Sequence, residues 1–165
     1  MVPREAKTGF DSQHPDMKKL KIPYYRQETD YFCGPAALKM ALEFFGKKVS
    51  QKKLAGLLKT NEKRGTLRRD MIKTARGFGL SARGFFGKNL DEVKKFLNTG
   101  NIAIVIFVEP SSEEDHYSVL AGVGRGCVVL NDPLSGKNFE IKEKDFIARW
   151  NKWNRWFMVI GRRAL

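Results

Sequence analysis

One cysteine in this chain stands where its sulfur atom could act as a nucleophile. Cys33 lies between Phe32 and the dipeptide Gly34-Pro35, and the apolar residues that follow are spaced as on a helix. The free N–H groups and the positive dipole end at a helix N-terminus favour the thiolate over the thiol. Gly34 lets the backbone approach the sulfur, and Pro35 gives up an N–H that a first turn leaves unpaired. Read alone, Cys33 also fits a buried structural cysteine.

A nucleophilic cysteine needs a base, and that base needs a third group that orients its ring. His14 lies in a polar N-terminal stretch, which leaves His116 as the histidine of the folded region. It follows an acidic, loop-like stretch and opens an apolar run, although a surface histidine at a strand start would look the same. Asp132 ends the next apolar run, so a hairpin would bring it to the sheet end that holds His116. Taken alone, Asp132 is a turn residue before a proline.

Two further residues bear on the chemistry. Gln27, six residues before Cys33, carries an amide able to polarise a carbonyl oxygen, as an oxyanion hole requires, but it is also an ordinary loop residue. Cys127 lies in the apolar run CVVL and is interpreted as an inert strand residue. A zinc site built from Cys33, His116 and Asp132 is disfavoured, because the sequence has no close ligand pair such as CxxC or HxxxH.

The elements that must position these residues form two groups along the chain. The first half predicts short amphipathic helices within residues 35–46, 50–58, 66–79 and 89–100, with Ser50, Thr66 and Asn89 as N-caps. The second half predicts strands at residues 102–108, 116–123, 127–130, 139–141 and 155–161, with a short helix at 143–150. Helices followed by a mostly antiparallel sheet predict an α+β fold in which the two layers pack together. A length of 165 residues fits a single domain over residues 17–165, with residues 1–16 as a flexible tail.

Charge is the most unusual bulk property of the chain, whose formal net charge is +13. Residues 1–100 hold 22 basic and 10 acidic residues, whereas residues 101–165 hold 9 and 8. Such an excess would attract an anionic partner, or it would simply line solvated helix faces. The basic residues form scattered pairs without interleaved aromatic residues, which disfavours nucleic acid as the partner.

Other bulk features concern location. The longest apolar run, Ile102–Val108, is far shorter than the roughly 20 residues of a membrane-spanning helix, so we expect no membrane span. The N-terminal stretch lacks the apolar core of a signal peptide, and two cysteines cannot build a disulfide framework. We therefore expect a cytoplasmic location.

Taken together, these motifs resemble the bacteriocin-processing double-glycine peptidase family of papain-like cysteine peptidases. The resemblance rests on Gln27, the CGPAA helix start at Cys33, the HY pair at His116 and the NDP triplet at Asp132, and it covers roughly residues 22–159. It implies a papain-like fold with Cys33 as nucleophile, His116 as general base and acid, and Asp132 as the group that orients His116. It also implies that Gln27 and the Cys33 backbone N–H form an oxyanion hole, and that no metal or organic cofactor is needed.

The resemblance leaves the substrate open. The best-known members are N-terminal domains of peptide exporters, and we expect this chain to be a free-standing member that cleaves a peptide or protein, with a Gly-Gly leader as the family's default. The basic first half motivates the hypothesis that the substrate is acidic. Two alternatives remain: a papain-like acyltransferase or transpeptidase that uses the same thioester, and a non-catalytic basic module for an anionic partner. The intact set of Cys33, His116, Asp132 and Gln27 argues against the last of these.

Overall fold

The computed structural model describes residues 17–124 and 126–164, so that the predicted tail at residues 1–16 lies outside the described part. The helices are α2 (Cys33–Phe44), α3 (Gln51–Leu57), α4 (Arg68–Gly77), α5 (Leu90–Asn98) and α6 (Glu143–Asn151). The strands are β1 (Ser81–Phe85), β2 (Ile102–Val108), β3 (Asp115–Gly124), β4 (Cys127–Asp132), β5 (Gly136–Lys142) and β6 (Phe157–Gly161). Among the described residues, no helix is long and apolar enough to cross a membrane.

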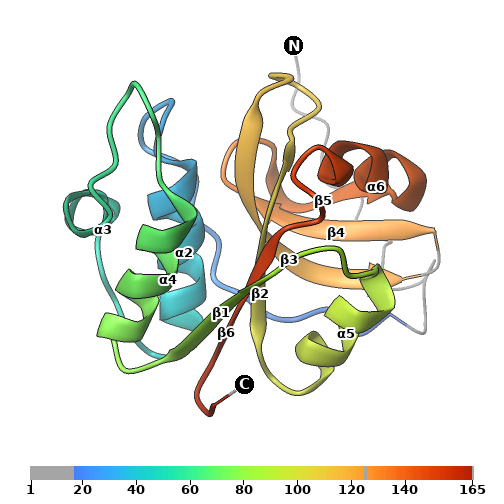
Figure 1. Cartoon of the computed structure of the whole chain (residues 1–165), viewed down its shortest axis with the longest axis horizontal. Coiled ribbons are helices and arrows are strands. Elements are labelled where there is room, and N and C mark those ends of the chain that lie inside the picture. The colour runs from blue at the N-terminus through green and yellow to red at the C-terminus, as the bar shows by residue number, and fades with distance from the viewer. Residues whose placement is uncertain (1–16, 125, 165) are drawn as a thin grey trace.

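The strands form one antiparallel sheet in the order β1-β6-β2-β3-β4-β5. Helices α2, α3 and α4 lie on one side of this sheet, and α5 and α6 lie on the other (Figure 1). The predicted α+β architecture is therefore confirmed, with the addition of a third layer. The predicted pairing of residues 116–123 with 127–130 is also confirmed, because β3 and β4 are neighbours.

Strand β2 shows why its apolar run is continuous. Its alternate side chains point to opposite faces of the sheet. Ile104 packs into the core beneath α2 and α4, whereas Val105 and Phe107 pack into the core beneath α5 and α6. Both faces are thus buried, and a strand buried on both faces cannot alternate between apolar and polar residues.

Helix α2 carries Cys33 as its first residue, and Pro35 occupies the first turn as predicted. Gly34 lies against the segment before α4, where a Cβ on residue 34 would collide with the Thr66 hydroxyl oxygen. This glycine therefore allows the N-terminus of α2 to lie close to that segment.

The helix caps were predicted with mixed success. The Ser50 side chain accepts from the backbone N–H of Lys53, and Asn89 forms the expected capping box with Glu92. The prediction of Thr66 as a cap was wrong: Leu67 is the N-cap of α4 and supplies no side-chain hydrogen bond. Thr66 fails as a cap because its hydroxyl group instead bonds to that of Thr60, 2.8 Å away.

Candidate active site

The N-terminus of α2 places the sulfur of Cys33 beside the start of β3. Helix α2 and β3 share one hydrophobic core, in which Leu38 and Tyr117 are buried and Cys33 is partly buried. At the first position of the helix, Cys33 faces backbone N–H groups without intrahelical partners, which stabilise a negative charge. The position is thus suited to a thiolate that solvent and substrate can still reach.

His116 and Asp132 form a buried pair, as the hairpin prediction required. The side chain of His116 is 6% exposed and that of Asp132 is fully buried, and their Nε2 and Oδ1 atoms lie 2.9 Å apart. Val119 pairs with Asn131 across β3 and β4, which puts Asp132 beside Ser118 and diagonal to His116. The Oδ1 atom also accepts from the backbone N–H groups of Leu134 and Ser135.

The electrostatics of His116 favour its protonated form. Burial lowers the pKa of His116, but hydrogen bonds to Asp132 and Cys33, together with the negative charges of both groups, raise this pKa to about 10. Since Nε2 faces Asp132, the other ring nitrogen is the one available to Cys33. At neutral pH the arrangement therefore favours an imidazolium next to a sulfur that can bear the opposite charge.

Gln27 lies in the segment that leads to Cys33, and this segment is fastened to the Asp132 turn. The Gln27 backbone N–H donates to the Pro133 carbonyl at 3.0 Å, and the Tyr24 hydroxyl donates to the Asp132 carbonyl at 2.8 Å. The Gln27 side-chain Nε2 donates to the carbonyls of Thr29 and Asp30, at 3.0 and 3.2 Å. Both donors of the amide thus bind the residue's own loop, and its role in an oxyanion hole stays a prediction.

A further polar side chain, that of Glu109, was not predicted from the sequence and contacts the turn that follows Asp132. Glu109 follows β2 and is fully buried. Its Oε2 accepts from Ser111 N, Ser111 Oγ and Ser112 N at 2.6–3.0 Å, and its Oε1 accepts from Ser135 Oγ at 2.5 Å. Burial raises the pKa of Glu109, but these hydrogen bonds outweigh burial and lower the pKa to about 2. The available signal was a lone carboxylate directly after a buried strand and just before two serines.

Two cavities meet at Cys33 and form a cleft with two arms. One arm, of about 330 Å³, is lined by His116, Tyr117, Arg68 and Trp153, and we call it the arginine arm. The other, of about 580 Å³, is called the acidic arm, because its lining includes Asp30, Glu62, Glu114 and Asp115. Cys33, Arg64, Gly65 and Asp115 line both. The acidic arm therefore carries more negative charge than the arginine arm.

The segment between α3 and α4 forms one wall of the arginine arm. The Tyr117 hydroxyl donates to the Thr66 carbonyl at 2.8 Å, which ties this wall to the residue next to His116. This wall and β3 are therefore held together by a hydrogen bond as well as by core packing.

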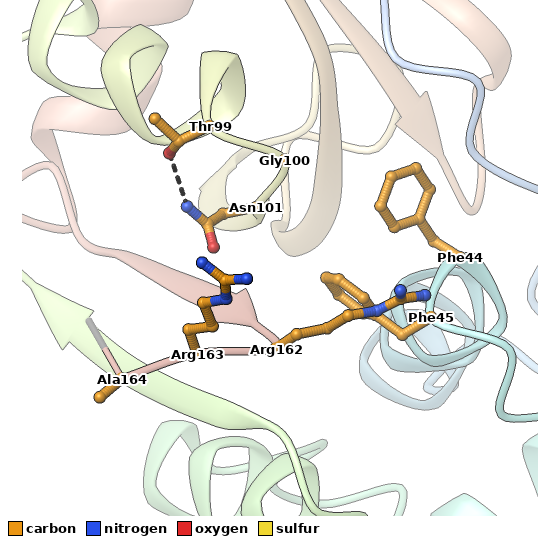
Figure 2. Close-up of a pocket in the computed structure, with 8 residues that line it drawn as sticks. All are labelled: Phe44, Phe45, Thr99, Gly100, Asn101, Arg162, Arg163 and Ala164. Atoms are coloured by element: carbon orange, nitrogen blue, oxygen red, sulfur yellow. Dashed lines mark hydrogen bonds between the residues drawn. The ribbon is translucent and has the colours of Figure 1, made fainter.

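A further cavity, of about 620 Å³, lies away from Cys33 and has no nucleophile in its lining. Figure 2 shows Phe44 and Phe45 on one side of it, and Arg162 and Arg163 extending across it toward Phe45 and Asn101. The Arg162 guanidinium lies 5.6 Å from the centre of the Phe45 ring. The C-terminal ends of α2 and α5 both reach this cavity, where their partial negative charge suits the two arginines.

The polar residues of the site are also of the types that bind metal ions. Within residues 17–124 and 126–164, no group of three or more His, Cys, Asp or Glu side chains is placed to hold a metal ion.

Cys127 is a buried residue of β4, and burial raises the pKa of its thiol. The two cysteines therefore stand in opposite settings.

Sequence comparisons relate this chain to known proteins. Residues 19–156 match the profile of the Peptidase C39-like family. An uncharacterised protein of Methanothermobacter marburgensis is 35% identical to this chain over 112 residues, which cover 68% of this chain and 72% of that protein.

Solved structures share the fold. The peptidase domain of Streptococcus ComA, a bifunctional ABC transporter of a quorum-sensing pathway, has a TM-score of 0.71 and 22% identity, covering 85% of this chain and 98% of the domain. A double glycine motif protease from an AMS/PCAT transporter, solved with a leader peptide, has a TM-score of 0.71 and 23% identity, covering 87% and 93%. A structure assigned as a C39-like peptidase of Bacillus anthracis has a TM-score of 0.79 and 17% identity, covering 91% and 100%.

Proposed function

Because this chain belongs to the Peptidase C39-like family, we propose that it is a cysteine peptidase that hydrolyses peptide bonds through a thioester on Cys33. The observation that carries the proposal is the buried pair of His116 and Asp132, 2.9 Å apart, with Cys33 in the lining of the same arm of the cleft as His116. A histidine that is paired with a carboxylate and lies beside a thiol at a helix N-terminus has the parts of a nucleophile, a base and an orienting group.

Each side chain has a step in the proposed reaction. The Cys33 thiolate attacks the substrate carbonyl carbon, and protonated His116 gives its proton to the leaving amine as the C–N bond breaks. Neutral His116 then takes a proton from water, which attacks the thioester and breaks the C–S bond. The products of this second step are a carboxylic acid, the Cys33 thiolate and protonated His116, and the amine was released in the first step. Asp132 holds the His116 ring in place and stabilises its positive charge throughout.

Stabilisation of the oxyanion is assigned to the Cys33 backbone N–H and the Gln27 side chain. This role requires the Gln27 amide to exchange one of its two loop carbonyls for the substrate oxygen. The Gln27 backbone is fixed to the Asp132 turn, so that only the side chain needs to move.

The substrate is proposed to be a peptide, with cleavage after a Gly-Gly leader as the more specific form of the proposal. Support for that form comes from the double glycine motif protease solved with its leader peptide, a protein of the same fold. Transfer of the acyl group to an amine uses the same thioester, so the test must distinguish the two outcomes.

A peptide-library digest analysed by mass spectrometry tests the proposal, with Cys33→Ala and His116→Ala as matched controls. We expect the wild-type protein to cut at a shared sequence position and both variants to lose those cuts. Adding an amine nucleophile in a parallel digest separates free acids, the products of hydrolysis, from amides, the products of transfer. Identical fragments from wild type and Cys33→Ala would refute the proposal.

A further inference from the structure

Arg68, the first residue of α4, has surroundings that local structure does not explain. Its guanidinium lines the arginine arm together with His116. A cation at a helix N-terminus is unfavourable, because that end of the helix carries partial positive charge. The position of Arg68 therefore calls for another source of stabilisation.

Aromatic rings supply that stabilisation. The guanidinium carbon of Arg68 lies 5.3 to 5.7 Å from the centres of three rings, those of Phe86, Trp153 and Trp156. Cation–π contacts of this kind stabilise a guanidinium without supplying acceptor oxygens to its N–H groups. The rings thus fix the cation in the cleft without using its hydrogen bonds.

Among the residues that the structure describes, the Arg68 guanidinium takes part in no ion pair and no hydrogen bond. No acidic group of those residues therefore occupies the edge of the guanidinium. Asp115, the carboxylate that lines the same arm, accepts from Trp153 Nε1 at 2.9 Å and lies 3.2 Å from Lys152 Nζ. The neighbouring Arg69 differs from Arg68 in both exposure and pairing. Its side chain is 81% exposed, and its Nε atom lies 3.9 Å from the Asp70 carboxylate.

The positive charge of Arg68 acts inside the cleft. Burial and the charges of Cys33 and Asp70 raise the pKa of Tyr117, whereas the charge of Arg68 lowers this pKa. The acidic arm would repel a negative group. An anionic side chain of a substrate is therefore favoured in the arginine arm over the acidic arm, and this preference orients the substrate.

We propose that Arg68 is the specificity-determining residue of the cleft, and that the peptide substrate carries an Asp or Glu side chain at the position that lies against it. The planar guanidinium would bind this carboxylate through two parallel N–H···O bonds. The inference rests on the proposed function and adds the substrate's chemical class to it.

The test labels Cys33 with short bromoacetyl peptides in which a single Glu or Gln stands one to four residues from the reactive group. The Cys33 sulfur forms a C–S bond and bromide leaves, so no peptide hydrolysis is needed. We expect one Glu peptide to label wild-type Cys33 roughly three- to tenfold faster than its Gln counterpart, the effect of one hydrogen bond of typical net strength. Arg68→Gln should bring that ratio to about one, and Arg68→Lys should retain part of it.

Arg69→Glu and Arg68→Glu form the matched pair, because both change the net charge equally. Arg69→Glu should keep the preference for Glu, and Arg68→Glu should reverse it. A Glu to Gln ratio that is the same in wild type and Arg68→Gln, or no preference at any position, would overturn the inference. Slow labelling of Cys33, no faster than that of Cys127, would instead count against the proposed function, and the ratio would still be measured.

Discussion

A single oxygen atom, Oδ1 of Asp132, faces the His116 ring and accepts two backbone N–H groups as well. The backbone contacts fix the carboxylate in the turn, and the fixed carboxylate fixes the ring. The ring in turn is the only partner through which Asp132 acts on Cys33 in the proposed mechanism. In this proposed mechanism Asp132 is a positioning residue, and both its charge and its fixed orientation contribute.

Replacing Asp132 by Asn tests that charge. The variant retains Oδ1 but loses the negative charge that helps to raise the pKa of His116 to about 10, so this pKa falls. The leaving amine needs the His116 proton, and we expect the alkaline limb of kcat/KM to move to lower pH by about one unit or more. Turnover should fall less than in Cys33→Ala, because the nucleophile remains. A pH profile whose alkaline limb does not move would contradict this role.

At the scale of elements, the site depends on how closely α2 approaches the segment before α4. Gly34 permits that approach, since a Cβ would collide with the Thr66 side chain. The same segment is tied to β3 by the Tyr117 hydroxyl. The cleft wall, the nucleophile and the histidine are therefore positioned by one set of contacts.

Gly34→Ala should destabilise the protein by about 1–3 kcal/mol, the usual effect of overpacking, and slow the labelling of Cys33. Gly56→Ala is the matched control, because nothing lies within 4 Å of the added Cβ and alanine favours the α3 helix. Thr66→Gly should relieve the Gly34→Ala defect in the double variant. Chemical denaturation checks the stabilities, and equal stability of Gly34→Ala and Gly56→Ala would show that the close approach does not matter.

Glu109 joins the β2–β3 turn to the Asp132 turn. Since Glu109 has a pKa lowered to about 2, the stability it contributes is present above its ordinary value of 4.5 and is lost as the pH falls toward 2. We expect Glu109→Gln to destabilise the protein at pH 7 by about 1–3 kcal/mol, through poorly satisfied buried donors. The difference from wild type should shrink as the pH falls from about 4.5 to about 2. Denaturation curves at several pH values measure this, and a difference independent of pH would refute the assignment.

The elements show what the sequence could and could not predict. Apolar residues at helical spacing predicted α2 and α4, and a continuous apolar run predicted β2, because these side chains pack into a core. Strand β1 was missed, since it is a short edge strand in which only Ala82 is buried. Thr66 was assigned as a cap because its type and position suit one, but the distant partner Thr60 takes its hydroxyl.

The same limit applies to the site residues. His116 and Asp132 could be predicted to meet, because a hairpin brings them to one end of the sheet. The prediction that Cys33 joins them rested on the family resemblance and not on the spacing alone. The Gln27 amide contacts depend on the conformation of its own loop, which spacing does not determine. The serines next to Glu109 were a local signal that was not used, whereas its contact with Ser135 is distant in the chain. The aromatic contacts of Arg68 also come from distant segments, so no local pattern marks that residue.

At the scale of the whole molecule, the sheet separates the layer of α2, α3 and α4, which carries Cys33, from the layer of α5 and α6 (Figure 1). Each layer packs on its own face of the sheet. The net charge of +13 belongs mostly to the first 100 residues, which include the nucleophile's layer. The cleft itself is mixed in charge, with acidic residues in one arm. Long-range attraction and local recognition are therefore distinct effects.

Salt separates these effects. We expect kcat/KM for a peptide with acidic flanking residues to fall as ionic strength rises from about 0.01 to about 0.15 M, because the Debye length falls from about 30 to about 8 Å. A peptide of the same length with neutral flanking residues should change much less. Equal salt dependence of the two peptides would exclude a role for the basic surface in substrate capture.

The central claim, that Cys33 is an activated thiolate paired with His116, is tested most directly by the rate of alkylation with iodoacetamide near pH 6. Mass spectrometry of the intact and digested protein measures the extent of alkylation of Cys33 and of Cys127 in the same sample. The account predicts that Cys33 reacts much faster than Cys127, and that His116→Ala removes most of this advantage while the protein stays folded. A Cys33 that reacts no faster than a free thiol, at a rate that His116→Ala leaves unchanged, would contradict it.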